Sequence, residues 1–238
     1  MTRLPPLRSL VLFDIDGTLL LTAGAGRRAI TAALQAELGG SDAFERVRFD
    51  GKTDPQIVME LLDLAGHPGA ADAEFVWSLC RRYVGYLAEE LRHPRSETTV
   101  MPGITALLEA LESRDDVMLG LLTGNMREGA ALKLQAAGIA PDRFPVGAFG
   151  SDSARRPDLP AIAAERAEPH FGRRPHGREV IIIGDTPADV TCGRGIAARA
   201  IGVATGAYPL AALAEAGADH AFEDLSDTVR VLEAILGE

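Results

Sequence analysis

Short, almost entirely apolar runs alternate along this chain with longer segments in which apolar residues recur at helical spacing. Runs of a few residues that are apolar at nearly every position are typical of strands buried on both faces, and the helical segments between them would cover those faces. The pattern therefore predicts an α/β fold built on a doubly wound parallel sheet. The predicted strands are residues 10–13, 117–122, 146–149, 180–183 and 200–203, and the predicted helices are residues 104–111, 128–137, 159–166 and 190–198.

The region from about Thr22 to Pro102 follows a different pattern. It contains helical spacing over 26–38, 55–65 and 74–91 and no convincing buried strand. We interpret it as a helical insertion after the first strand. The predicted domains are therefore an α/β core made of residues 1–21 and 99–238 and an inserted helical domain of residues 22–98, while the polar segment 168–178 is predicted to be a surface loop.

The first predicted strand ends in two carboxylates, Asp14 and Asp16, and Gly17 follows at once. Side chains alternate along a strand with period two, so both carboxylates are expected to point the same way. Two unit charges about 4 Å apart repel by roughly 4 kcal/mol at an effective dielectric constant near 20. We therefore expect either a bound cation or a proton kept on one of the two groups.

A second acidic cluster, Asp185 and Asp189, follows another apolar run. Asp185 lies at a predicted strand end, where it could bind a cation, while Asp189 either supports that cation or N-caps a helix starting near Val190. Oxygen ligands from neighbouring strand ends suit magnesium, and the scattered histidines offer no zinc site.

Two further segments could recognise an anion. Thr123, Gly124 and Asn125 follow a predicted strand and precede a helix, so a hydroxyl, backbone N–H groups and a helix N-terminus would face the same crevice. A simple helix cap is the alternative role for Thr123 or Asn125. Arg156, directly before Pro157, either supplies a fixed positive charge to that crevice or lies in a solvated turn, and Arg155 is the alternative register.

Composition narrows the function classes. The 238-residue chain carries a formal net charge of −10, which disfavours general nucleic-acid binding. No apolar stretch reaches membrane-spanning length, and the first residues are not typical of a signal peptide. With only two cysteines, Cys80 and Cys192, the chain is not a disulfide scaffold, and we expect a reduced cytoplasmic setting. The oligomeric state is not predicted.

Taken in order, these motifs resemble the haloacid dehalogenase superfamily. The sequence DxDGT at Asp14 and Asp16, a strand-end Thr123, a basic residue before proline at Arg156, and GDxxxD at Asp185 and Asp189 follow the family pattern. The resemblance implies a Rossmann-like core and makes the helical insertion the family's cap domain. The chain looks most similar to the phosphoglycolate phosphatase-like group with a helical cap.

The resemblance also implies roles for these residues. Asp14 would be the nucleophile that accepts the phosphoryl group, and Asp16 would be the general acid and then the general base. Asp14, the backbone carbonyl of Asp16, and Asp185 would hold Mg²⁺, with Asp189 in support. Thr123, Gly124 and Asn125 would bind the phosphoryl oxygens. Asp16 favours phosphate ester cleavage over carbon–halogen cleavage, because a departing alkoxide needs a proton and a halide does not.

One position departs from the family, which usually has lysine where this chain has Arg156. The chain has only two lysines, Lys52 and Lys133, and Lys133 is predicted to be a surface residue of a core helix. Arginine can also neutralise carboxylate and phosphate, although it is wider than lysine.

The predicted function is therefore a magnesium-dependent phosphatase acting on a small phosphorylated metabolite, either phosphoglycolate-like or a sugar phosphate. A phosphomutase of the β-phosphoglucomutase type and a catalytically weakened phosphate-binding or partner-docking module are the alternatives. Lys52 in the insertion could bind the substrate or be exposed beside an Asp54 N-cap. Arg27 and Arg28 are expected to be solvated, and Trp77, Tyr83 and Tyr86 are expected in the core of the insertion.

Overall fold

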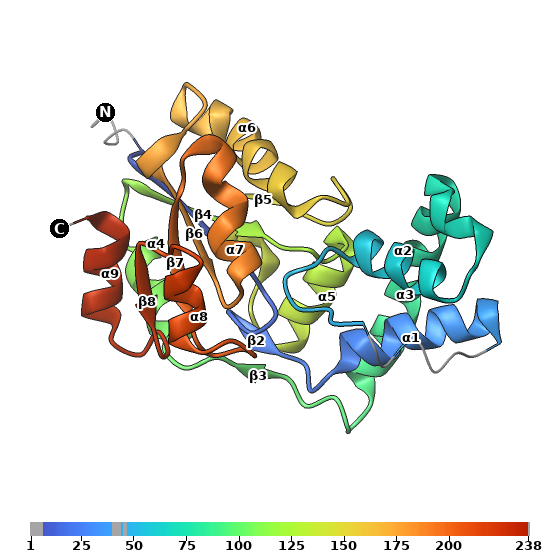
Figure 1. Ribbon diagram of the computed structural model, residues 1–238. Helices are drawn as coiled ribbons and strands as arrows, with labels where there is room; N and C mark the ends of the chain where they lie inside the picture. Colours follow the sequence, from blue (N-terminus) through green and yellow to red (C-terminus); the bar gives the residue numbers. More distant parts are fainter. Residues whose placement is uncertain (1–6, 40–43, 45–46, 238) are drawn as a thin grey trace.

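A six-stranded parallel sheet forms the centre of the molecule (Figure 1). The computed structural model describes residues 7–39, 44 and 47–237, so the predicted features of residues 1–6 lie outside it. The strand order is β5-β4-β1-β6-β7-β8. The α/β prediction is confirmed, and the strands are β1 (Ser9–Phe13), β4 (Val117–Leu122), β5 (Val146–Ala148), β6 (Val180–Gly184), β7 (Arg199–Val203) and β8 (His220–Phe222).

Strand β1 shows why the sheet is covered on both faces. Its residues are all buried, and alternate side chains enter different hydrophobic clusters. Val11 and Phe13 pack in the cluster that contains helix α4, whereas Leu10 and Leu12 pack in the cluster that contains helix α6. A strand with no polar face must be covered on both sides, which accounts for the helices on either side of the sheet.

The core helices follow the strands in sequence and pack against them. They are α4 (Ile104–Glu112), α5 (Arg127–Ala136), α6 (Leu159–Phe171), α7 (Pro187–Cys192), α8 (Leu210–Glu215) and α9 (Thr228–Leu236). Short 3₁₀ helices complete the connections: η2 (Pro68–Ala71), η3 (Pro141–Arg143), η4 (Arg156–Asp158), η5 (Gly177–Glu179) and η6 (Gly193–Ile196).

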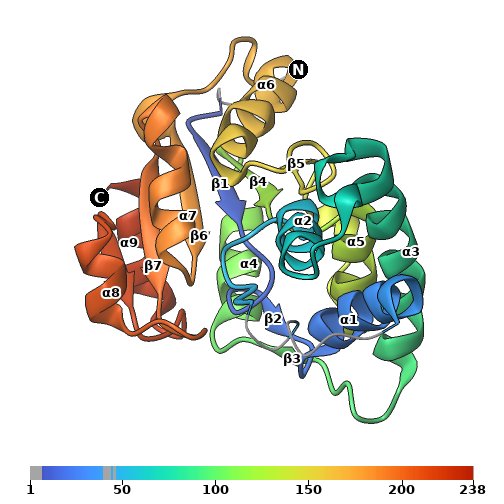
Figure 2. The same ribbon diagram turned by 45° about the vertical axis from the view of Figure 1, so that its right-hand side comes forward.

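Helices α1 (Ala25–Leu38), α2 (Asp54–Leu64) and α3 (Ala73–Arg92) form a group beside the carboxyl ends of the strands, which Figure 2 shows at the right. We call these three helices, together with the loop that leads into α2, the cap. It has its own hydrophobic cluster, in which Tyr83 is almost fully buried and Trp77 and Tyr86 are partly buried. Strand β2 (Leu20–Leu21) pairs antiparallel with β3 (Thr99–Val100) where the chain enters and leaves the cap. The domain limits at residues 22 and 98 stay a prediction.

Two predicted helices have wrong boundaries, and the one predicted over 190–198 ends already at Cys192, where the 3₁₀ helix η6 follows. Helix α6 continues through Pro169 to Phe171, where a loop was expected from residue 168, because a proline in the last turn removes only one backbone hydrogen bond. Helix α7 begins at Pro187 and not near Val190, since Thr186 accepts a hydrogen bond from the backbone N–H of Asp189 and is the N-cap.

Within the described ranges, no helix combines the length and the hydropathy needed to cross a membrane. Both cysteines are free and buried.

Candidate active site

Three parallel strands bring their carboxyl ends together at one point of the sheet. Phe13 at the end of β1 is aligned with Leu121 in β4 and with Ile183 in β6. Asp14, Thr123 and Asp185 follow these strands closely and are all buried. Residues far apart in sequence thus meet because the register of the sheet aligns the strands that carry them.

Asp14, Asp185 and Asp189 form a buried acidic triad, with one oxygen from each carboxylate within 4.8 Å of the others. Burial, with smaller contributions from neighbouring carboxylates, raises the pKa of Asp185 well above its usual range and raises that of Asp14, against the attraction of Arg156. Such a cluster of oxygen donors could hold a metal ion.

The backbone beside the triad passes so close to it that only glycine fits at one position. Gly17 has a φ of +82°, and a Cβ there would clash with the carboxylate of Asp185. The DxDGT sequence therefore needs glycine both for the left-handed turn and for the close approach of the second acidic segment. The hydroxyl of Thr18 donates a hydrogen bond of 3.2 Å to Oδ1 of Asp185.

Arg156, in helix η4, is 4% exposed and lies against the triad. Its Nη2 is 3.2 Å from Oδ1 of Asp14 and also donates to Oδ1 of Asp189. Burial disfavours the charged guanidinium, but Asp189 and Asp14 outweigh this and raise the pKa of Arg156. Arg155 is exposed, so the basic residue that reaches the triad is the one directly before the proline.

Asp189 is already engaged through both carboxylate oxygens. Oδ1 accepts from Arg156, while Oδ2 accepts from the backbone N–H of Thr186 at 3.0 Å and from its hydroxyl at 2.6 Å. The two residues form a capping box at the start of α7. The predicted N-cap role of Asp189 is therefore wrong. Its position lets it orient Arg156.

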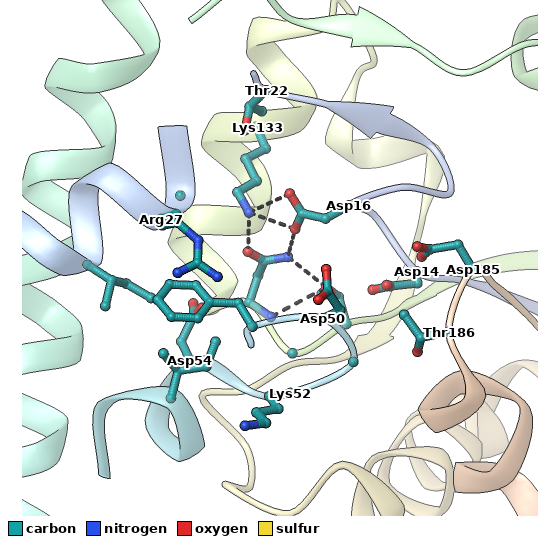
Figure 3. A pocket seen from close by; sticks show the side chains of 18 of the residues that line it. Asp14, Asp16, Thr22, Arg27, Asp50, Lys52, Asp54, Lys133, Asp185 and Thr186 are labelled. Carbon is teal, nitrogen blue, oxygen red and sulfur yellow. Dashed lines mark hydrogen bonds and ion pairs between the residues drawn. The ribbon is translucent and has the colours of Figure 1, made fainter. Parts of the chain in front are cut away.

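The prediction that Lys133 is a surface residue is wrong. Lys133 is 4% exposed on α5, and its Nζ donates to both oxygens of Asp16 at 2.8 and 2.6 Å (Figure 3). The sequence contains one signal of this: Lys133 shares a helix face with Ala130 and Leu134, which are buried. A lysine on the apolar face of a helix needs a buried partner.

Asn125 joins the same group. Its Oδ1 accepts from Lys133 at 2.6 Å, and its Nδ2 donates to Oδ2 of Asp16 and to Oγ1 of Thr123, both at 2.8 Å. The side chain predicted to bind substrate is thus occupied with the carboxylate of Asp16. The hydroxyl hydrogen of Thr123 remains available to donate to an anion.

The loop that leads into α2 rests on the core and closes the site from the cap side. The hydroxyl of Thr53 donates to the carbonyl of Ala154 at 2.7 Å, and the backbone N–H of Asp54 donates to the carbonyl of Gly124 at 2.7 Å. A Cβ at Gly124 would clash with the carbonyl of Lys52, so this contact requires glycine.

Asp54 is not the N-cap of α2, because Thr53 takes that position. The carboxylate of Asp54 is buried and accepts a hydrogen bond of 2.7 Å from the backbone N–H of Met126 at the start of α5. Burial raises the pKa of Asp54 to about 7, against the attraction of Lys133.

The basic residues of the cap differ in their partners. Lys52 lines the cavity but forms an ion pair with Glu60. Arg27 also lines the cavity, donates to the carbonyls of Phe44 and Val47, and has no carboxylate partner among the residues that the structure describes. Arg28 points elsewhere and binds Glu90.

The cavity between the triad and the cap has a volume of about 230 Å³, enough for a small metabolite. Its lining residues fall into three groups. The triad side contributes Asp14, Arg156 and Asp185. The hydrogen-bonded group around Asp16, which we call the network side, contributes Asp16, Thr123, Asn125 and Lys133. The cap contributes Arg27, Phe49, Lys52, Asp54 and Tyr83.

Comparison with known proteins agrees with this geometry. The family model described as haloacid dehalogenase-like hydrolase matches residues 11–194. No curated protein matches the chain significantly.

Several solved structures share the fold over nearly the whole chain. A hydrolase from Pseudomonas syringae has a TM-score of 0.73 at 24% identity, covering 96% of this chain and 99% of its own. A predicted phosphoglycolate phosphatase from Haemophilus somnus has a TM-score of 0.67 at 19% identity, covering 95% and 98%. CbbY from Rhodobacter sphaeroides, in complex with phosphate, has a TM-score of 0.70 at 20% identity, covering 93% and 96%.

Proposed function

The chain belongs to the haloacid dehalogenase-like hydrolase family, and on that premise we propose that it is a phosphatase which cleaves small phosphate monoesters through an aspartyl-phosphate on Asp14. One observation carries the proposal: a buried carboxylate, Asp14, is paired with Arg156, and a second carboxylate, Asp16, lines the same cavity on its network side. Acid–base and nucleophilic groups are thereby separated but face the same small volume.

The residues of the triad fit a magnesium ion. Three buried carboxylates face one arginine, which leaves an excess of negative charge that only a cation or protons can offset. In our proposal Asp14, Asp185 and the backbone carbonyl of Asp16 hold Mg²⁺, as is general in the family, while Asp189 holds Arg156. When bound, the ion neutralises charge on the phosphoryl group and lets an anion approach the carboxylates.

The proposed reaction has two steps. In the first, a carboxylate oxygen of Asp14 forms a bond to phosphorus, the phosphorus–oxygen bond to the leaving group breaks, and the leaving oxygen takes a proton from Asp16. In the second, Asp16 accepts a proton from water, the water oxygen attacks phosphorus, and the bond to Asp14 breaks to give inorganic phosphate.

Arg156 and Thr123 would stabilise the phosphoryl oxygens during both steps. The guanidinium of Arg156 lines the cavity beside Asp14, so its fixed positive charge would meet the phosphoryl group there.

The substrate is proposed to be phosphoglycolate-like or a sugar phosphate. The cavity volume limits the substrate to a small molecule. Arg27 is the cap cation best placed to meet a second anionic group, because the ammonium of Lys52 is already paired with Glu60. The expected cytoplasmic setting and the absence of nucleic-acid and membrane partners stay predictions from composition.

The test is hydrolysis of 4-nitrophenyl phosphate and of phosphoglycolate by the purified protein, with magnesium and after chelation. We expect phosphate release that stops in chelator and returns with magnesium. Replacement of the nucleophile in Asp14→Asn should reduce turnover at least about a thousand-fold. Activity that persists in chelator contradicts the metal assignment, and activity that persists in Asp14→Asn contradicts the nucleophile.

The same assay separates the alternatives once a sugar phosphate is added to its substrates. A phosphomutase would return an isomerised sugar phosphate and release little inorganic phosphate. A phosphate-binding module would bind inorganic phosphate and release none from either ester.

A further inference from the structure

Lys133 is a buried cation whose hydrogen-bonding capacity is fully used by two side chains of the cavity, Asp16 and Asn125. Its ammonium group has three N–H donors, and three oxygens lie within hydrogen-bond distance: both oxygens of Asp16 and Oδ1 of Asn125. No donor is left over for a substrate. The side chain of Lys133 is 5% exposed, whereas that of Asp16 is 42% exposed.

Asn125 makes this contact directional. Because its Oδ1 accepts from Lys133, its Nδ2 must face the other way, where it donates to Oδ2 of Asp16 and to Thr123. Asp16 follows β1, Asn125 follows β4, and Lys133 comes from α5. Two N–H groups of Lys133 and one of Asn125 therefore fix the carboxylate of Asp16, which would otherwise rotate about two single bonds.

The surroundings keep the ammonium in place. A Cβ at Gly26 would lie 3.3 Å from Nζ of Lys133 and 4.0 Å from the hydroxyl of Tyr83, so glycine at this position leaves room for both groups. Burial of an ammonium is costly unless it is paired, and Asp16 supplies the pairing. The ion pair is thus maintained by packing from the cap and from the core.

We propose that Lys133 is a positioning residue that, together with Asn125, holds the carboxyl group of Asp16 in the orientation required for proton transfer to and from the substrate. This rests on the proposed function, in which Asp16 protonates the leaving oxygen and then accepts a proton from water. Lys133 itself does not touch the reacting atoms. It sets where the proton-transferring oxygen of Asp16 lies.

The experiment compares two leaving groups. 4-Nitrophenolate leaves easily without a proton, whereas the alkoxide from glycerol 3-phosphate needs one, so only the second substrate depends strongly on the general acid. We would measure kcat/KM, which covers the steps up to departure of the leaving group, for the wild type, Lys133→Met, Asp16→Asn and the double variant.

If Lys133 acts through Asp16, Lys133→Met lowers kcat/KM for glycerol 3-phosphate about 10- to 100-fold and for 4-nitrophenyl phosphate several times less. Asp16→Asn shows the same preference for the better leaving group with a larger loss. In the Asp16→Asn background, Lys133→Met causes little further loss, because the residue through which it acts is already gone.

An equal loss for both substrates, or an undiminished loss in the Asp16→Asn background, overturns the proposal. If the loss is equal for both substrates and arises entirely from a higher KM, Lys133 would instead be a residue that contacts the substrate. A wild type that hydrolyses neither ester contradicts the proposed function itself, so the two failures are distinguishable.

Two further variants guard against simple loss of folding. Lys133→Gln keeps a neutral donor in place of the ammonium and is expected to show the same leaving-group preference, more weakly. Arg199→Met removes another buried cation, whose hydrogen-bond partners among the described residues are backbone carbonyls at the opposite end of the sheet. Thermal unfolding shows how much of the Arg199→Met protein is folded. The folded protein should have the wild-type ratio of kcat/KM for glycerol 3-phosphate to kcat/KM for 4-nitrophenyl phosphate.

Discussion

The two sides of the cavity hold their charges in different ways. On the triad side, Asp14, Asp185 and Asp189 face one guanidinium, so negative charge is in excess. On the network side, Asp16 meets one ammonium and one amide, and its charge is balanced. The triad is therefore suited to take up a cation, while the network is suited to hold one carboxyl group in a fixed place.

The difference separates two tasks that the same residue type must perform. A carboxylate that attacks phosphorus must come close to a dianion, which requires strong neutralisation nearby. A carboxylate that moves protons must instead be correctly oriented. Asp14 and Asp16 are separated by a single residue, yet their different surroundings suit them to these two tasks in the proposed reaction.

Removal of the guanidinium on the triad side should have the greatest consequence. Arg156→Met leaves Asp14 and Asp189 buried without their cation, so we expect activity to fall at least about 100-fold and the free energy of unfolding to fall by about 3–5 kcal/mol. Arg156→Lys restores a cation of the type usual in the family and should recover most of both losses. Phosphate release and urea unfolding measure them.

Arg155→Met is the matched control, because it removes the neighbouring arginine, which is exposed. It should change both quantities little. If Arg155→Met impaired activity as much as Arg156→Met, the assignment of Arg156 to the triad would be wrong.

The triad residues could be predicted from the sequence, and so could Asp16, Thr123 and Asn125 on the network side, but Lys133 could not. Asp14, Thr123 and Asp185 directly follow apolar strands, and in a parallel sheet such positions meet at one edge. Lys133 is a helical lysine more than a hundred residues from Asp16, and only its spacing from Ala130 and Leu134 indicated burial.

The choice between Arg155 and Arg156 also required the structure. Both precede the same helix, and the sequence favours Arg156 only through its place before Pro157. The geometry of η4 sends Arg156 to the triad and leaves Arg155 exposed. Likewise, the contacts of Thr53 and Asp54 with the core depend on how the cap closes, which local patterns do not encode.

The cap side of the cavity contains a buried acid, Asp54. Its pKa is raised from 3.8 to about 7, so between these pH values the folded protein binds a proton that the unfolded chain releases. Stability therefore falls as the pH rises through this window. Relative to Asp54→Asn, the wild type should lose free energy of unfolding between pH 4 and 7, on the order of 4 kcal/mol at most.

The measurement is urea unfolding of both proteins at several pH values in that range. Asp63→Asn is the control, since Asp63 is exposed on the same helix. Its difference from the wild type should not vary with pH. A constant difference between the wild type and Asp54→Asn would mean that water reaches Asp54 and that the cap side is more open than its contacts indicate.

The smallest expected effect distinguishes the two cap cations that line the cavity. Lys52 is paired with Glu60 in a partly exposed ion pair, whereas Arg27 has no carboxylate partner within the described residues. Arg27→Met should therefore raise KM for phosphoglycolate by about three- to tenfold, and Lys52→Met by less than about threefold, with kcat little changed in both.

Arg28→Met is the control, because it removes the same charge from the next position of α1. The side chain of Arg28 binds Glu90 and does not line the cavity, so KM should stay at the wild-type value. The reverse order, with Lys52→Met the more damaging, would mean that substrate displaces Glu60 and that the charge balance of the cap side changes on binding.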